Sequence, residues 1–370
     1  MEAAATETER VGLTYQALGG HCGTLAQATL ARSPQLSDLL DLGRYRRLVS
    51  RLELRAFAED HIDAAGSLLA ARFRAHRAVE PLLSERFEDP DAALIEVASL
   101  WAEEDASGAV ALRGGRVVGF LLGTRRNDQA WGANVWIEWG GHAVEEAEEI
   151  RDLYAAAAGR WVEEGRTRHY VVVPAMDATL VDAWFRLSFG QQQVHGVRDV
   201  PAEIDVQLPD GVAIRQPAEA DVGALIDVHL ALPLHHRSSP VFSARALPTR
   251  EESRREWLKT LATSEEKILV AFRGDRPVAC WSVMPIALSP ERPYLLWREP
   301  ACYLGFASTL PEARGGGVGV ALTQATLDWA REQRYQVMVT DWRATNLLSS
   351  RFWPRRGFRP AFLRLYRSIP

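Results

Sequence analysis

The sequence predicts a mixed α/β protein built from two α/β units in tandem. The first sign is an internal repeat: residues 54–60 resemble residues 214–220 at an offset of 160 (214 minus 54). The second is a shared hairpin signal, because Arg113-Gly114-Gly115-Arg116 recurs as Arg273-Gly274-Asp275-Arg276 between apolar, β-rich segments. The third is a glycine-rich loop at 315–319, which separates a β-rich segment from a helical pattern.

The limits of the two units follow from a change in this offset. Trp184 corresponds to Trp353 at an offset of 169 (353 minus 184), and two further pairs share this offset. Those pairs are Asp177 with Asn346, and Phe189 with Phe358. The second unit therefore has extra residues between its third strand and its last helix. We expect an N-terminal extension at 1–50, a first domain at 51–200 and a second domain at 211–370.

The N-terminal extension has a composition of its own. Residues 1–11 are small, polar and charged, which predicts disorder. Residues 12–50 are predicted to be mostly helical, because Ser33-Pro34 is a good helix start ahead of an apolar face. His21-Cys22 is read as a loop histidine beside a small apolar cysteine rather than as a ligand or nucleophile pair.

Composition limits the class of function. The chain has 370 residues and a net charge of −5, without a basic patch, so we expect no nucleic-acid partner. No apolar run reaches the length of a membrane span, and the first residues lack a secretion signal, so we expect a cytoplasmic protein without a membrane partner. Three widely spaced cysteines predict neither a disulfide framework nor a metal site. Lysine occurs only at 259 and 267, which is typical of arginine-biased, high-GC bacterial coding.

The glycine-rich loop is the main candidate site. Glycines ahead of a helix leave several backbone N–H groups free, and the helix dipole is positive at that end. Such a loop binds anions, and a pyrophosphate is a natural ligand. A P-loop is excluded because Gly319-Val320-Ala321 lacks the Lys-Ser/Thr pair. A dinucleotide fingerprint is disfavoured because the loop lies near the C-terminus.

At these residues the chain resembles the GNAT acyltransferase superfamily. Arg314, Gly317 and Gly319 match the family's pyrophosphate loop, Arg/Gln-x-x-Gly-x-Gly/Ala. Asn346 and Trp353, followed by Gly357-Phe358, match its next motif, an Asn, an aromatic residue seven positions later and Gly-Phe. The resemblance covers Val212 to the C-terminus and, more weakly, the preceding residues, so it implies two tandem GNAT-like folds, each a mixed, mostly antiparallel sheet flanked by helices. The two-copy layout is similar to that of the mycothiol synthases, whose C-terminal copy is the catalytic one.

The resemblance implies acetyl transfer from acetyl-coenzyme A, as co-substrate, to a small-molecule amine. The pantetheine is expected along the fourth strand, and the pyrophosphate at the amides of the glycine loop. The residues that this places at the cofactor are Phe306, Ser308, Thr309, Leu310, Arg314, Gly315, Gly316, Gly317, Val318, Gly319, Val320, Asn346 and Trp353. Two alternatives stay open: a non-catalytic acyl-coenzyme A binding or scaffolding protein, and acyl transfer to a hydroxyl, a thiol or a protein lysine.

The catalytic acid and base are less clear in the sequence. Asp341, after the fifth strand, is the expected general base, and weaker candidates are Glu299, Glu312 and His236. Trp353 stands where the family often has a tyrosine that protonates the leaving thiolate, and an indole N–H cannot supply that proton at neutral pH. Tyr335 and Tyr366 are read as strand or core residues.

The region expected to line the acceptor site is 233–248, predicted to be irregular. It contains His235 and His236, which either contact the acceptor or belong to a solvated loop. The C-terminal arginines either hold the 3′-phosphate or form a solvated surface. Those arginines are Arg343, Arg351, Arg355, Arg356 and Arg359. In the first unit, Trp131, Trp136 and Trp139 are read as core or as an exposed partner face.

The first unit differs at the loop position. There the sequence reads Gly140-Gly141 and then an acidic segment, and a shift of 168 (329 minus 161) places Glu146 and Glu149 opposite Arg314 and Gly317. Carboxylates suit the helix dipole but repel a pyrophosphate. We expect this copy to be degenerate and either structural or part of the substrate site. The alternative is a divergent loop that still binds.

Overall fold

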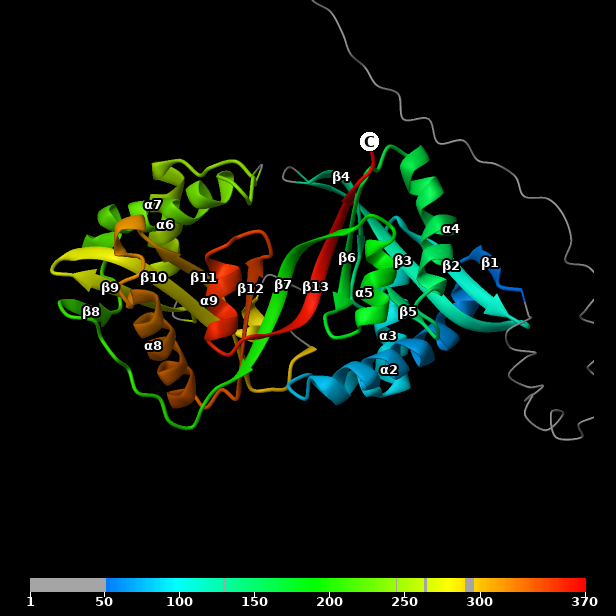
Figure 1. Ribbon diagram of the computed structural model, residues 1–370, viewed down its shortest axis with the longest axis horizontal. Coiled ribbons are helices and arrows are strands. Elements are labelled where there is room, and N and C mark those ends of the chain that lie inside the picture. Colours follow the sequence, from blue (N-terminus) through cyan, green and yellow to red (C-terminus); the bar gives the residue numbers. More distant parts are fainter. Residues whose placement is uncertain (1–50, 129–130, 244, 263–264, 290–295) are drawn as a thin grey trace, which may run out of the picture. The chain divides into compact units, whose positions relative to one another are not determined.

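The computed structural model describes residues 51–128, 131–243, 245–262, 265–289 and 296–370 (Figure 1). The predicted extension at 1–50, with His21-Cys22, lies outside these residues. Residues Arg51–Pro370 form one compact unit. None of the described helices combines the length and apolarity needed to cross a bilayer, and within the described part of the chain no group of His, Cys, Asp and Glu side chains could hold a metal ion.

The two copies share the order of their α-helices and main strands. The first consists of β1 (Glu53–Ala56), η1 (Glu59–His61), α2 (Ile62–Val79), η2 (Arg86–Glu88), α3 (Pro90–Trp101), β2 (Ala106–Arg113), β3 (Arg116–Asp128), β4 (Gly132–Ile137), β5 (His142–Val144), α4 (Glu149–Glu163), β6 (Arg168–Pro174), α5 (Ala178–Phe185) and β7 (Gly190–Asp199). The second consists of β8 (Val212–Arg215), η3 (Glu219–Asp221), α6 (Val222–Arg237), α7 (Arg250–Leu261), β9 (Lys267–Arg273), β10 (Arg276–Pro285), η4 (Ile286–Leu288), β11 (Ala301–Thr309), η6 (Pro311–Ala313), α8 (Val318–Glu332), β12 (Val337–Arg343), α9 (Ser349–Arg355) and β13 (Arg359–Ser368).

The two sequence offsets are reproduced by these elements. The starts of β3 and β10 differ by 160 residues, whereas the starts of β4 and β11, α4 and α8, and β6 and β12 all differ by 169. The additional residues of the second copy therefore lie between its third and fourth strands, where η4 is found.

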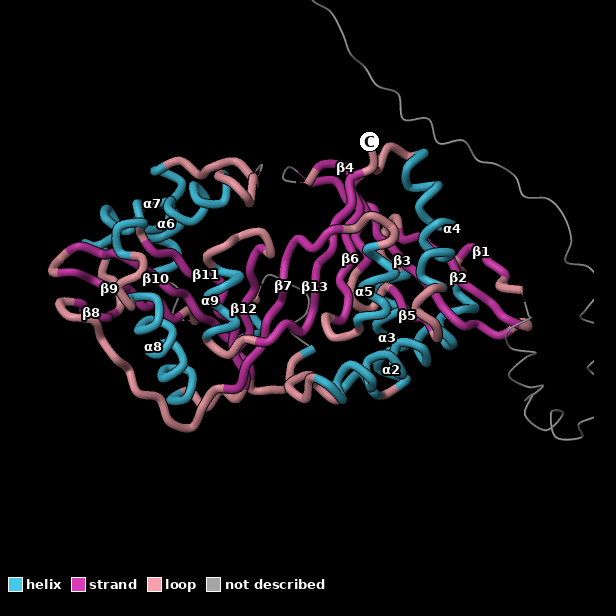
Figure 2. Tube along the Cα trace, viewed as in Figure 1, coloured by secondary structure: helices cyan, strands magenta, loops and turns pink. Residues whose placement is uncertain are grey.

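A single mixed sheet runs through both copies, and their last strands are exchanged (Figure 2). The strand order is β1-β2-β3-β4-β6-β13-β7-β12-β11-β10-β9-β8, with β5 paired to β3. Thus β13 of the second copy pairs with β6 of the first, and β7 of the first pairs with β12 of the second. The predicted boundary at 200–211 separates the repeats along the sequence, but in space each copy completes its sheet with a strand from the other.

Helices cover both faces of the sheet. Alternation along β9 places Val270 among α6 and α7, and its neighbour Leu269 in the core cluster that contains residues of α8. In the first copy, α2 and α3 pack on one face, and α4 packs on the other (Figure 1). One core cluster includes residues of α4, α5, α8 and α9, so the two copies share an apolar core as well as a sheet.

The fourth and fifth strands of the second copy separate part-way along their length. Parallel pairing of β11 with β12 runs from Ala301 with Val337 to Leu304 with Thr340. Beyond this point β11 continues to Thr309 beside β10, with a bulge at Gly305. A side chain at Gly305 would meet the ring of Tyr303 at 2.8 Å, so glycine fits the bulge. The separation opens the sheet at the position expected for pantetheine.

Helix α6 corrects one expectation. The stretch from Pro233 was predicted to be irregular, but α6 continues through it to Arg237. Proline removes one intrahelical hydrogen bond, but it does not have to end a helix. His235 and His236 therefore lie on the last turn of α6. The next helix matches its prediction, since Thr249 and Glu252 form the capping box at the start of α7.

Candidate active site

The glycine loop forms the N-terminal end of α8. Gly317 is the N-cap residue and has φ +79°, and Gly315 has φ +78°, which is a conformation that other residues rarely adopt. The first-turn amides of α8 therefore follow a loop without side chains at its bends. These N–H groups have no partners within the helix, and together with the helix dipole they provide an anion site.

A cavity of about 440 Å³ runs from this loop along β11. Three of the predicted contacts do not line this cavity: Gly316, Phe306 and Leu310, whose side chain is buried in the core cluster that contains residues of α6 and α7. Phe306 lines the neighbouring cavity described below. The predicted cofactor residues that line the 440 Å³ cavity are Ser308, Thr309, Arg314, Gly315, Gly317, Val318, Gly319, Val320, Asn346 and Trp353.

The backbone of β11 adds a second binding element. Past Leu304 its edge facing β12 has no partner among the described strands. An exposed strand edge offers N–H and C=O groups to an extended ligand. The side chain of Arg314 turns back toward the end of β11, where its Nε donates to the carbonyl of Thr309 at 3.2 Å.

Arg273 is a candidate contact for the pyrophosphate that was not predicted from the sequence. It ends β9 and was read only as part of a hairpin turn. In the structure, one of its Nη atoms lies 3.1 Å from the position that a Cβ on Gly316 would occupy. A guanidinium beside the glycine loop is well placed for a phosphate oxygen. The sequence held one signal for this role of Arg273. Both copies have an RGxR turn, but only the first copy has an acidic loop.

A second cavity, of about 620 Å³, meets the first at the separation of the strands. Side chains from three elements line both cavities, and they mark the junction. They are Leu232 of α6, Ala307 of β11, and Asn346, Ser349 and Trp353 at α9. The two cavities are therefore continuous at these residues. The second cavity is the expected place for an acceptor.

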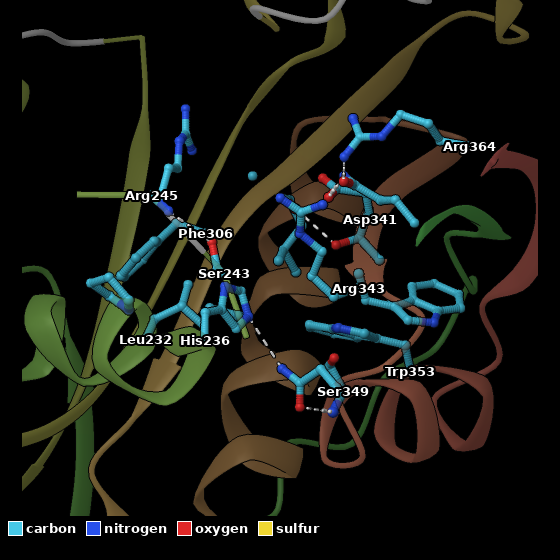
Figure 3. A pocket seen from close by; sticks show the side chains of 18 of the residues that line it. Leu232, His236, Ser243, Arg245, Phe306, Asp341, Arg343, Ser349, Trp353 and Arg364 are labelled. Atoms are coloured by element: carbon cyan, nitrogen blue, oxygen red, sulfur yellow. Dashed lines mark hydrogen bonds between the residues drawn. The ribbon is translucent and has the colours of Figure 1, made fainter. Parts of the chain in front are cut away.

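Asp341 lies in this second cavity, within β12 rather than after it as predicted. The hydroxyl of Tyr303 donates to its Oδ1 at 2.5 Å, and the side-chain amide of Gln193 donates to its Oδ2. Gln193 belongs to β7, the strand contributed by the first copy, and is itself held by Arg364 of β13. The carboxylate therefore has one fixed orientation, set by strands of both copies (Figure 3).

The two adjacent histidines, His235 and His236, line different cavities. His235 lines the first and His236 lines the second, and Asn346 lies between them. The Nε2 of His235 lies 3.1 Å from the Oδ1 of Asn346, and the Nδ2 of Asn346 lies 3.3 Å from the Nε2 of His236. Burial, and after it the charge of Arg343, lowers the pKa of His236 to about 4. His236 is therefore neutral at pH 7 and is a weak base.

The other acid–base candidates lie away from this junction. Glu312 is exposed and pairs with Arg276 at 2.6 Å, and Glu299 is also exposed. Tyr335 packs against Trp329. Tyr366 stacks on Tyr170 at 4.9 Å.

The C-terminal arginines have several roles. Arg343 lines the acceptor cavity, whereas Arg359 forms a two-point pair with the buried Glu80 of the first copy. Arg356 lies over the ring of Phe352. Arg351 and Arg355 are exposed, as a solvated surface requires.

In the first copy the corresponding anion site is filled by the protein itself. The structural correspondence is 169, so Gly317 matches the N-cap Glu148, one residue away from the sequence alignment. Glu148 pairs with Arg186 at 2.7 Å, and Glu149 pairs with Arg113 at 2.9 Å. The Oε2 of Glu149 also accepts from the backbone N–H of Glu146 at 3.2 Å. A carboxylate of the acidic segment thus accepts from one N–H of the loop, and neighbouring arginines pair with Glu148 and Glu149.

The tryptophans of the first copy have different environments. Trp139 is buried between Phe73 and Phe87, as a core residue. Trp136 stacks on Tyr170 at 4.7 Å. Trp131 lines the acceptor cavity of the second copy.

Comparison with known proteins agrees with this geometry. Residues 233–358 match the acetyltransferase (GNAT) family. The chain therefore contains a GNAT-family domain in its second copy. Its repeated element order shows that the fold is present twice, in tandem. The match of residues 233–358 supports acyl transfer from an acyl-coenzyme A as a general activity.

Solved structures of the same fold are distant in sequence. A GCN5-related N-acetyltransferase from Sphaerobacter thermophilus has a TM-score of 0.51 and 14% identity, over 86% of this chain and 95% of that one. The glucosamine N-acetyltransferase region of a fungal multi-domain β-N-acetylglucosaminidase has a TM-score of 0.51 and 14% identity, over 86% and 38%. A tandem GNAT protein from the clavulanic acid biosynthesis pathway has a TM-score of 0.44 and 15% identity, over 86% and 99%. No curated protein sequence matches the chain significantly.

Proposed function

We propose that the second copy transfers the acetyl group of acetyl-coenzyme A to a small-molecule amine. The observation that carries this proposal is the junction of two cavities at Asn346, Ser349 and Trp353. One cavity begins at an anion-binding helix terminus and follows a free strand edge. The other holds an oriented carboxylate, Asp341. A thioester in the first would present its carbonyl carbon to a nucleophile in the second.

In this mechanism the protein mainly positions the reactants. The glycine loop and Arg273 hold the pyrophosphate, and the edge of β11 holds the pantetheine. The amine lies near Asp341, which takes its proton as the nitrogen attacks the thioester carbon. The C–N bond forms and the C–S bond breaks, and the thiolate leaves. Holding both partners in one orientation lowers the barrier by removing the entropy cost of bringing them together.

Asp341 is the stronger base candidate because its geometry is fixed. Tyr303 and Gln193 occupy one site on each carboxylate oxygen, which leaves further lone pairs for the amine. His236 is weaker, because Asn346 already lies against its Nε2 at 3.3 Å.

The test measures release of coenzyme A from acetyl-coenzyme A with a panel of small amines. Asp341→Asn keeps the side-chain shape and is expected to lower kcat by about 10²–10⁴-fold, because a general base is lost. Asp328→Asn is the matched control, since Asp328 pairs with Arg331 on α8 away from the cavities. Its kcat should equal that of the wild type.

Two other outcomes would replace this function. Binding of acetyl-coenzyme A without release by any amine would favour a non-catalytic binder. Release with alcohols, thiols or a lysine-containing peptide, but not with small amines, would keep acyl transfer and change the acceptor. An equal kcat for Asp341→Asn and the wild type would remove Asp341 from the mechanism.

A further inference from the structure

The acceptor cavity is unusually cationic. Arg343, Arg364 and Arg245 line it, and Asp341 is the one carboxylate among its described lining residues. Both oxygens of Asp341 already accept hydrogen bonds from Tyr303 and Gln193. The carboxylate of Asp341 is thus bound by these two donors. It forms no ion pair with the three arginines in the described part of the chain.

Two of these guanidinium groups lie near the same aromatic ring. The Cζ of Arg343 lies 5.3 Å from the ring centre of Trp131, and the Cζ of Arg364 lies 5.7 Å from the centre of the same ring. Arg364 is 7% exposed, so solvent screens it poorly. Burial, followed by the charge of Arg364, lowers the pKa of Arg343 to about 10. The group stays cationic at pH 7, and its position beside a second cation carries an energetic cost.

A third cavity extends this cationic surface. It has a volume of about 460 Å³ and shares Trp131, Ser243, Arg245 and Arg343 with the acceptor cavity. Its remaining charged lining residue in the described chain is Arg168, and no acidic side chain of the described residues lines it. Arg343 therefore stands between the two cavities. The junction with the coenzyme A cavity lies at the other side, at Asn346 and Trp353.

We propose that the acceptor is an anionic amine, whose carboxylate or phosphate group binds Arg343 and Arg364 while its amine lies at Asp341. This inference rests on the proposed acetyl transfer. In Figure 3, Asp341, Arg343 and Arg364 face His236, Phe306 and Leu232 across the cavity. A guanidinium fork binds carboxylate and phosphate oxygens in pairs. An anion placed there offsets the repulsion between the two cations, and it orients the far end of the acceptor.

Much of this surface comes from the first copy and from the exchanged strands. Trp131 and Arg168 belong to the first copy, and Arg364 lies on β13, which pairs with β6 and β7. Arg364 donates to Gln192 at 2.9 Å and also to Gln193, so its side chain is fixed before a ligand binds. The copy that has lost its own anion loop would thus supply part of the acceptor's anion site.

The first arm of the test measures binding without turnover. Inorganic phosphate and succinate are titrated at constant ionic strength into the full-length protein saturated with coenzyme A. Arg343→Gln should weaken binding of the recognised anion about tenfold or more, and Arg343→Lys should weaken it less, because the charge remains without the fork. Arg331→Gln, at an exposed pair on α8, is the control and should bind as the wild type does.

The second arm uses matched amines in the coenzyme A release assay. The pairs are O-phosphoethanolamine with ethanolamine, and β-alanine with β-alaninamide. The anionic member of at least one pair should have a kcat/KM about tenfold or more above its neutral partner, mainly through KM. Arg343→Gln should remove that preference. Preference within the first pair identifies a phosphate, and preference within the second identifies a carboxylate.

The two arms separate failure of this inference from failure of the proposed function. Equal or better use of the neutral amines would overturn the anionic acceptor while keeping acetyl transfer. No turnover with any amine would count against acetyl transfer, and anion binding would then decide the inference alone. Equal anion binding by the wild type and Arg343→Gln would overturn it in either case.

Discussion

The two copies share a topology but treat the same helix terminus in opposite ways. In the second copy, α8 begins after glycines, and the neighbouring Arg273 forms no ion pair with a carboxylate of the described residues. In the first copy, α4 begins at Glu148, and the counterpart of Arg273, Arg113, pairs with Glu146 and Glu149. In the first copy carboxylates of the chain itself lie at the positive end of the helix dipole, whereas in the second copy this end follows glycines.

The same contrast continues along the strand that would hold pantetheine. Leu232 of α6 lines the open cavities, and its counterpart at the 160 offset is Arg72 of α2. The guanidinium of Arg72 donates to the carbonyls of Trp139 and His142, and burial lowers its pKa to about 9. In the second copy the apolar Leu232 cannot donate in this way, and the carbonyl of Pro311, the counterpart of His142, accepts from the backbone N–H of Arg314 at 3.2 Å instead.

This comparison shows that one fold can surround the same helix terminus with different side chains. The polar groups that a cofactor would satisfy remain in the first copy, because they belong to the backbone. Leaving them buried and unpaired would cost about 1–3 kcal/mol each. In the first copy the side chains of Arg72 and Glu149 bind some of these backbone groups, and Trp131 of that copy lines the 620 Å³ cavity of the second.

The largest expected effect comes from giving the second copy the charge of the first. Gly317→Asp places a carboxylate at the N-cap, as Glu148 does in the first copy, and should weaken acetyl-coenzyme A binding about 100-fold by repelling the pyrophosphate. Gly317→Asn is the isosteric control, since both residues tolerate the left-handed conformation at φ +79°. It should weaken binding only a few-fold.

Calorimetry of the wild type and both variants gives affinity and stoichiometry together. One site per chain in the wild type, strongly weakened only in Gly317→Asp, is the expected result. Two sites, or a single site that is insensitive to this aspartate, would mean that the first copy still binds the cofactor.

The fold could be read from the sequence because its signals are local and repeated. The shift from an offset of 160 to one of 169 located the inserted segment, and the RGxR turns located the hairpins. The exchange of β7 and β13 could not be read in this way. Both strands are buried along their middle residues, and which fifth strand each one joins is decided by long-range packing across the whole unit.

The candidate site was predictable only where its signal lay within one segment. The glycine loop and the Asn346–Trp353 spacing are contiguous motifs. Gln193 and Arg364 could not be assigned to the cavity, because they reach it through the strand exchange. His235 and His236 were placed in a loop because Pro233 precedes them, and this was wrong, since one missing hydrogen bond is tolerated near the end of a packed helix.

A smaller effect should appear in the pH dependence of stability, and it belongs to the filled site of the first copy. His142 is fully buried, and burial and the charge of Arg72 lower its pKa to about 3. The unfolded chain binds a proton at this histidine below about pH 6.5, and the folded chain does not. The free energy of unfolding should therefore fall as the pH drops from 6.5, by up to about 1.4 kcal/mol per unit for this residue.

Urea unfolding between pH 8 and pH 5 checks this sign. His142→Gln keeps a donor for the carbonyl of Val172, which lies 3.0 Å from the Nε2 of His142. The variant should show a shallower fall with pH than the wild type. Its unfolding free energy at pH 8, where the histidine is neutral in both states, measures the packing cost separately. An unchanged slope would show that His142 does not titrate as its burial implies.

The smallest expected effect sharpens the comparison at the junction of the cavities. Ser349 lies one turn before Trp353 on α9 and lines both cavities, and its Oγ is buried without a hydrogen-bond partner in the described part of the chain. Its counterpart at the 169 offset is Leu180, which is core. A hydroxyl in this position can donate a hydrogen bond to the leaving thiolate, which Trp353 cannot protonate.

Ser349→Ala should lower kcat about three- to tenfold with an unchanged KM for acetyl-coenzyme A, corresponding to one hydrogen bond of about 1 kcal/mol. Ser350→Ala, which changes the neighbouring residue outside both cavities, should leave kcat unaltered. Equal kcat values for the two variants would assign the unpartnered hydroxyl to packing alone.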